Sequence, residues 1–213
     1  MKVSVNGMDI QTFLLGITGG IGSGKSYVSR LFVKHGIPVY DTDKMAKAVI
    51  ANNQDLRDKI SELIPAAFSN GIYDTKHVAQ VIFSDDEKRL QLTDLVGLYL
   101  KDDFEKFITK NSNSKALCVE SAIIQSKWLI NMLDGVLEVV ADEETRISRI
   151  ISRDGRSREQ ALSIMKTQSR FSNPTFTIAN NGQDVEKNVL DIIKNIQSRY
   201  KTDIKAVYKL ITA

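Results

Sequence analysis

The residues with the clearest chemical signature lie in a glycine-rich segment, residues 19–26, which reads GGIGSGKS. Its spacing fits the phosphate-loop pattern Gly-x-x-x-x-Gly-Lys-Ser, in which glycines let backbone N–H groups approach phosphate oxygens without a Cβ in the way. In that pattern Lys25 reaches the β- and γ-phosphates, and the Ser26 hydroxyl is a ligand of Mg²⁺. The segment therefore predicts a site that binds a nucleoside triphosphate.

The sequence on either side supplies the elements that such a loop requires. Residues 13–17 are apolar and few, as in a buried parallel strand, and residues 27–34 carry apolar side chains at helical spacing. The alternative is a structural turn that merely opens a helix. The order strand, glycine turn and helix favours the phosphate site, because the positive end of a helix dipole attracts anions.

A carboxylate is expected near the same site. Residues 37–40 predict a second strand, and Asp43 follows it closely. In a doubly wound parallel sheet the carboxyl ends of the strands face one crevice, so we expect Asp43 near the γ-phosphate. There it would hold an attacking hydroxyl and accept its proton late in the transfer. The alternative is that Asp43 caps the next helix.

The middle of the chain has a different pattern. Residues 55–111 predict helices without strands, with a turn at Asn70-Gly71 and a bend or break at Gly97 within the helix of residues 85–110. An all-helical insertion between two strands suits a substrate domain hinged on the core. Simple packing against the sheet is the alternative.

Three further strands are predicted at residues 116–119, 136–140 and 176–179. Glu120 follows the first of them, where an acid either assists Mg²⁺ through water or lies beside a helix N-terminus. Asn180 follows the last, where an amide either reads a base edge or supplies turn chemistry. The fold class is α/β, with three layers around a parallel five-stranded sheet that carries the phosphate loop, a helical insertion and a helical lid.

Arginines concentrate between residues 142 and 170. Arg146, Arg149 and Arg153 are three and four residues apart and share one helix face. Guanidinium groups match the geometry of phosphates, so this segment predicts a lid that closes on a polyphosphate. The alternative is a solvated helix pair with surface arginines.

Composition excludes several other classes of function. The formal net charge of +3 is too small for nucleic-acid binding by bulk charge, and no apolar run is long enough to span a membrane. Cys118 is the only cysteine, so a disulfide framework is excluded and a reducing cytoplasm is expected. We therefore expect a cytoplasmic protein that acts on a small molecule, without nucleic-acid or membrane partners.

Several motifs occur together in a characteristic order: residues 18–26, Gly36-Ile37 leading to residues 41–43, Arg149 with Arg153-Asp154, Gln168, and residues 180–182. In this combination the chain resembles the dephospho-coenzyme A kinases over about residues 13–200. The resemblance implies a five-stranded parallel core, a helical coenzyme A-binding domain and a lid. It also implies transfer of the γ-phosphate of ATP to the 3′-hydroxyl of dephospho-coenzyme A, with Asp43 as the base.

The chain departs from the family pattern in a few positions. Tyr27 stands where the family usually has Thr, Thr75 where Arg is expected, Gly97-Leu98 in place of His-Pro, and Ser126 in place of Glu. Most of these positions lie on the presumed acceptor side. A kinase for another nucleoside-like hydroxyl acceptor is therefore a second hypothesis. A nucleotide-operated switch is the third, although the chain has no Asn-Lys-x-Asp guanine-reading sequence.

These observations lead to specific assignments. We predict a nucleotide-binding core of residues 1–54, 112–141 and 171–213, a substrate-binding insertion of residues 55–111 and a lid of residues 142–170. ATP and Mg²⁺ are the expected cofactors, with Ser26 as metal ligand, and dephospho-coenzyme A is the expected substrate. The residues expected to be catalytic are Asp43, Lys25 and Arg153. The residues expected to bind the nucleotide are Gly20, Ile21, Gly22, Ser23, Gly24, Lys25, Ser26, Tyr27, Arg149 and Asn180.

Overall fold

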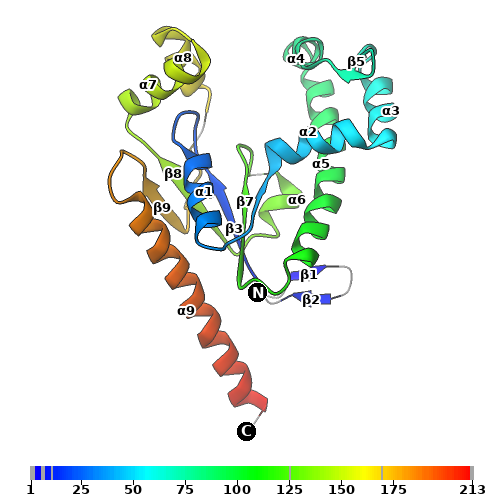
Figure 1. Ribbon diagram of the computed structural model, residues 1–213. Coiled ribbons are helices and arrows are strands. Elements are labelled where there is room, and N and C mark those ends of the chain that lie inside the picture. The colour runs from blue at the N-terminus through cyan, green and yellow to red at the C-terminus, as the bar shows by residue number, and fades with distance from the viewer. Residues whose placement is uncertain (1–2, 6–7, 11, 125, 169, 212–213) are drawn as a thin grey trace. The chain divides into compact units, whose positions relative to one another are not determined.

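The computed structural model describes residues 3–5, 8–10, 12–124, 126–168 and 170–211 (Figure 1). The chain divides into two compact units. The first comprises Met1–Tyr40 and Ile108–Ala213, and the second is Asp41–Phe107. The strands β1 (Val3–Val5) and β2 (Met8–Ile10) pair antiparallel in the first unit.

The first unit is built on a five-stranded parallel sheet, as the sequence predicts. Its strand order is β4 (Val39–Asp41), β7 (Ala116–Glu120), β3 (Phe13–Thr18), β8 (Gly135–Val140) and β9 (Phe176–Ala179). The register places Ile17 opposite Glu120 and Thr18 opposite Glu138. The central strand therefore reaches its carboxyl end between two acidic residues, just before the glycine-rich loop begins.

Helices cover both faces of this sheet. Helices α1 (Lys25–Lys34) and α9 (Val185–Ile211) contact each other and bury apolar side chains against one face, among them Val28, Phe32 and Val189. Ile124 and Leu133, on either side of the short helix α6 (Lys127–Ile130), lie against Gly16 of the central strand. A Cβ at Gly16 would lie 2.2 Å from Cδ1 of Ile124, so a larger residue there would displace that side chain.

Helices α7 (Glu143–Asp154) and α8 (Arg158–Lys166) form a pair between β8 and β9 in the chain. They share a small core of Ile147, Ile150 and Ala161, against which Ile21 of the glycine-rich loop packs. A capping box at Ser157 starts α8, and Gly155, with φ +65°, ends α7. The arginine-rich segment is thus a helix pair in direct contact with the loop.

The second unit is mostly helical. Its helices are α2 (Thr42–Asn52), α3 (Gln54–Leu63), α4 (Thr75–Ser84) and α5 (Asp86–Lys110), the last of which continues into the first unit. They surround a core that includes Leu56, Ile60 and Val78. The side chains of Asp41, Asn53 and Asp74 cap the first three helices.

Two expectations for this unit are wrong. The segment is not free of strands, because β5 (Phe68–Ser69) and β6 (Ile72–Tyr73) form a hairpin around Asn70-Gly71. Both turn residues have positive φ, at 49° and 76°, as two-residue hairpin turns require. Helix α5 also runs unbroken through Gly97, so the predicted break is wrong, while a bend there stays a prediction. Gly97 is buried, and packing outweighs the helix-propensity cost of about 1 kcal/mol.

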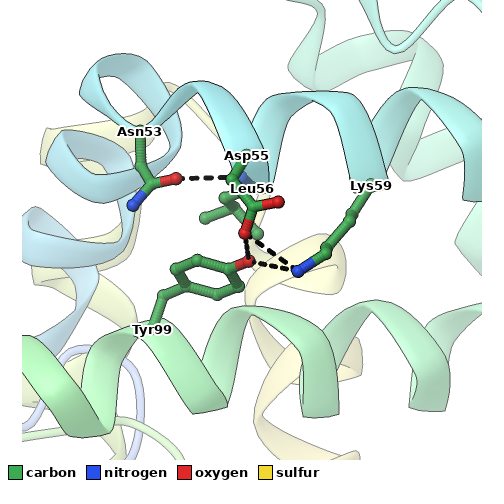
Figure 2. A network of polar contacts seen from close by, with 5 residues as sticks. All are labelled: Asn53, Asp55, Leu56, Lys59 and Tyr99. Carbon is green, nitrogen blue, oxygen red and sulfur yellow. Dashed lines mark hydrogen bonds and ion pairs between the residues drawn. The ribbon is translucent and has the colours of Figure 1, made fainter.

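A polar cluster joins α3 to α5 within the second unit (Figure 2). The Lys59 ammonium lies 2.9 Å from both Asp55 Oδ2 and the Tyr99 hydroxyl, and that hydroxyl donates to Asp55. Hydrogen bonds from Lys59 and Tyr99 lower the pKa of Asp55. Because the cluster is exposed, solvent screens it, and it contributes little to stability.

No helix in the described part of the chain has the length and hydrophobicity needed to cross a bilayer.

Candidate functional site

The glycine-rich loop, residues 19–24, connects β3 to α1, and two of its glycines are required by their surroundings. Gly22 has φ +77°, and a Cβ there would lie 2.7 Å from the backbone oxygen of Arg146. Gly24 has φ +86°, and a Cβ there would lie 2.1 Å from the side-chain nitrogen of Asn180. Glycine therefore lets helix α7 and the end of β9 approach the loop backbone closely.

The loop presents backbone donors that the protein leaves unused. Among the described residues, none accepts a hydrogen bond from the N–H groups of Gly22, Gly24, Lys25 or Ser26. Helix α1 has no acidic residue in its first turn and no side-chain cap. Unpaired amides at the positive end of a helix dipole form an anion site, which agrees with the phosphate-loop pattern.

Glu120 lies beside this helix start. Its carboxylate is buried, and Oε1 accepts a hydrogen bond from Ser26 Oγ at 2.5 Å and lies 3.5 Å from Lys25 Nζ. Along the chain, Glu120 does not adjoin the start of the following helix, because α6 starts at Lys127 with Ser126 as its N-cap residue. In space it lies beside the start of α1. The structure thus brings Lys25, Ser26 and Glu120 together.

Arg149 and Asn180 reach the loop from outside. Arg149 Nη1 donates to the carbonyls of Gly22 at 3.1 Å and Ser23 at 3.2 Å, and its Nη2 donates to the Asn180 carbonyl at 2.9 Å. The buried Asn180 side chain donates to Ser23 O at 2.9 Å. Both residues lie at the loop, and the contacts they make there are to loop carbonyls.

Ser23 is held inside the loop. Its N–H donates to Gly20 O at 3.0 Å, and its hydroxyl is buried without a hydrogen-bond partner among the described residues. Tyr27, on the first turn of α1, is 44% exposed.

Arg153 is not brought to the loop by any polar contact in the described structure. It lies in the last turn of α7, and its guanidinium makes a bidentate pair with Asp154 at 2.7 and 2.8 Å. This pairing raises the pKa of Arg153 and lowers that of Asp154. The arginine face of α7 is therefore divided, since Arg146 and Arg149 contact the loop and Arg153 pairs with its neighbour.

Asp43 lies in the second unit, exposed, in the first turn of α2. The capping role is filled by Asp41, whose Oδ1 accepts a hydrogen bond from the Lys44 N–H at 3.0 Å. The Asp43 carboxylate makes no hydrogen bond or ion pair with any residue that the structure describes. The structural alternative for Asp43, a helix cap, is therefore wrong.

Two contacts at the loop have no counterpart in the sequence-based assignments. Gln168 Oε1 accepts a hydrogen bond from the Ile21 N–H at 2.7 Å, and Arg146 Nε donates to the Ile21 carbonyl at 2.9 Å. Burial lowers the pKa of Arg146, and the charge of Arg170 adds to that effect, while Glu143 opposes it. The signal for Gln168 was its place among the motifs that carry the family resemblance, and the signal for Arg146 was the helix face that it shares with Arg149.

Arg170 forms an ion pair with a buried carboxylate. The carboxylate of Glu138, buried on β8, accepts hydrogen bonds from Arg170 Nη2 at 3.0 Å and from the Phe171 N–H at 3.3 Å. This pair fastens the end of the arginine-rich segment to the sheet.

Comparison with known proteins gives a consistent result. A family model described as Dephospho-CoA kinase matches residues 13–186. A dephospho-CoA kinase of Porphyromonas gingivalis is 37% identical over 157 residues, covering 73% of this chain and 77% of that protein. Another, of Fusobacterium nucleatum, is 29% identical over 190 residues, covering 86% of this chain and 95% of that protein.

Solved structures share the fold. The crystal structure of TT1252 from Thermus thermophilus matches with a TM-score of 0.76 at 26% identity, covering 89% of this chain and 98% of that chain. A dephospho-CoA kinase from Campylobacter jejuni matches with a TM-score of 0.61 at 19% identity, covering 86% and 96%, which supports the fold alone. The family match spans most of the sequence and includes the loop and its contacts, and the chain belongs to the dephospho-CoA kinase family.

Proposed function

We propose that this protein transfers the γ-phosphate of ATP to the 3′-hydroxyl of dephospho-coenzyme A and releases coenzyme A and ADP. The observation that carries the proposal is the set of amides of Gly22, Gly24, Lys25 and Ser26 at the start of α1, from which no described residue accepts a hydrogen bond. An ATP-binding loop of this kind, in a member of the dephospho-CoA kinase family, supports this reaction more directly than any other.

Phosphoryl transfer runs through a loose transition state, so the protein contributes mainly positioning and charge neutralisation. In our proposal the loop amides and the Lys25 ammonium hold the phosphates, and Arg153 leaves Asp154 to neutralise charge on the transferred group. Asp43 holds the acceptor hydroxyl. Because a carboxylate is a weak base towards an alcohol, orientation comes first and the proton moves late. The exposed and unpaired carboxylate of Asp43 is consistent with this role.

We also propose that Mg²⁺ accompanies ATP. The Ser26 hydroxyl and the Glu120 carboxylate offer the hard oxygen ligands that Mg²⁺ prefers, 2.5 Å apart beside the loop. Within the described residues, no group of three or more His, Cys, Asp or Glu side chains could hold a metal ion. Bound Mg²⁺ would neutralise phosphate charge, with Ser26 as a direct ligand and Glu120 acting through water.

Replacing Glu120 with Gln tests this metal role. The neutral amide keeps the shape but loses the charge, so we expect Mg²⁺ affinity in the presence of ADP to fall about 10- to 100-fold. Calorimetric titration of Mg²⁺ into the ADP-bound protein measures it. Glu138→Gln is the matched control, because Glu138 is also a buried sheet carboxylate but pairs with Arg170. Equal Mg²⁺ affinity in the Glu120→Gln and wild-type proteins would contradict the assignment.

The remaining assignments are proposals about the parts of the chain. Residues 55–111 would bind the acceptor, residues 142–170 would act as the lid, and the core would bind ATP in a cytoplasmic protein. Within the acceptor segment, Thr75 begins α4 and Leu98 is exposed on α5, both where the family pattern has other residues.

A coupled assay for ADP release decides the function. The wild-type protein is given ATP and Mg²⁺ with dephospho-coenzyme A, with adenosine or with other hydroxyl acceptors. Rapid ADP release with dephospho-coenzyme A alone supports the proposal. Preference for another acceptor would indicate a different small-molecule kinase. If no acceptor gives ADP release, a nucleotide switch is favoured.

A further inference from the structure

Ile21 of the loop is held at its N–H, its carbonyl and its side chain. The contacts come from helices α7 and α8 and from Gln168, which follows α8 in the chain. Its N–H donates to Gln168 Oε1 at 2.7 Å, and its carbonyl accepts from Arg146 Nε at 2.9 Å. Its side chain packs against the core of the helix pair, next to Ile147 and Ile150. Both polar groups of one loop residue are therefore fixed by side chains from one segment.

These contacts matter because of peptide geometry. In a trans peptide unit the carbonyl and the following N–H point in opposite directions. A side chain that holds the Ile21 carbonyl therefore turns the Gly22 N–H away from itself. The Gly22 N–H is one of the amides without an acceptor in the described structure. Arg149 and Asn180 stand in the same relation to Gly24, because they hold the Ser23 carbonyl.

The neighbours of Ile21 make such fixing necessary. Gly20 and Gly22 flank it, and glycine adopts many backbone conformations at similar energy, so the peptide units on either side could otherwise turn. Arg146 and Gln168 also approach Gly20 together. A Cβ at Gly20 would lie 2.6 Å from Arg146 Nη2 and 3.1 Å from Gln168 Oε1.

We propose that Gln168 and Arg146 are positioning residues. Arg146 holds the carbonyl of the Ile21–Gly22 peptide unit and Gln168 holds the N–H of the preceding unit, so together they fix the backbone on both sides of Ile21 and hold the Gly22 N–H ready for a phosphate oxygen. Neither side chain needs to touch the nucleotide in this arrangement. The inference rests on the proposed binding of a nucleotide by the loop. It also makes the arginine-rich segment part of the phosphate site before any ligand arrives.

Gln168 gives the cleaner test because it carries no charge. We expect Gln168→Met to weaken ADP binding about 3- to 10-fold, the effect of one lost hydrogen bond. Calorimetry with ADP and Mg²⁺ measures the affinity, and the ¹⁵N–¹H resonances of Gly22 and Gly24 report the amides directly. In Gln168→Met the ADP-induced shift of Gly22 should shrink more than that of Gly24.

Gln160→Met is the matched control, because the Gln160 side chain caps α8 by accepting from the Ser157 N–H and does not contact the loop. It should leave ADP affinity unchanged. Unchanged affinity in Gln168→Met, an equal loss in Gln160→Met, or equal reductions of the Gly22 and Gly24 shifts in Gln168→Met would each overturn the inference. If the wild-type protein itself fails to bind ADP, the proposed function fails instead, so the two failures are distinguishable.

Discussion

Replacing Asp43 with Asn is expected to lower turnover at least about 100-fold while ATP affinity stays close to that of the wild type. Asn keeps the size of the side chain but cannot accept the proton of the acceptor hydroxyl, and a positioned general base contributes about 100- to 10,000-fold. Asp43 does not cap α2, so its replacement leaves the cap in place. Steady-state ADP release and ATP calorimetry measure the two quantities separately.

Asp41→Asn is the control for this prediction. Asp41 caps α2, and Asn caps helices about as well as Asp, so this variant removes a nearby carboxylate without removing the cap. Near-normal turnover is expected from it. Wild-type turnover in Asp43→Asn would remove Asp43 from the chemistry, and a large loss confined to Asp41→Asn would move the role to Asp41.

Lys25→Ala is expected to weaken ATP binding and to lower kcat/KM by about 100- to 1,000-fold. The ammonium group is the one cationic side chain within residues 19–26, and groups that meet developing charge in an active site have effects of that size. Its removal also leaves the buried Glu120 carboxylate without its only cationic partner among the described residues, which adds repulsion towards phosphate.

Lys34→Ala removes a lysine from the other end of the same helix, where it forms an exposed pair with Glu186 at 2.7 Å. Exposed pairs contribute little, so this control should retain its activity. Normal ATP affinity together with a normal rate in Lys25→Ala would count against the loop as the phosphate site.

The sheet and the loop were predictable because their signals are local. Short apolar runs bounded by turn residues indicated the five strands, and the loop pattern fixed the positions of Lys25 and Ser26 beside one of them. The position of Glu120 at a strand end also followed from the pattern, since parallel strands finish at the same edge.

Other features depend on contacts that the sequence does not encode locally. The hairpin at Asn70-Gly71 has strands of only two residues each, too few for an alternating pattern to appear. Gln168 meets Ile21 across 147 residues of chain, so no spacing rule could pair them. Similarly, the sequence placed Arg149 near phosphate, and only the packing of α7 on the loop revealed its contacts with carbonyl groups.

The rate at which Cys118 is chemically modified can report how often the sheet opens. It is the only thiol, lies on β7 two residues before Glu120 and is 1% exposed, and burial raises its pKa. A thiol reagent should therefore modify it only in molecules whose β7 has come loose. Because ATP would bind only molecules whose sheet is intact, labelling of Cys118 at an ATP concentration about 100 times its dissociation constant should slow about 100-fold. The labelling rate therefore reports how strongly the nucleotide stabilises the sheet.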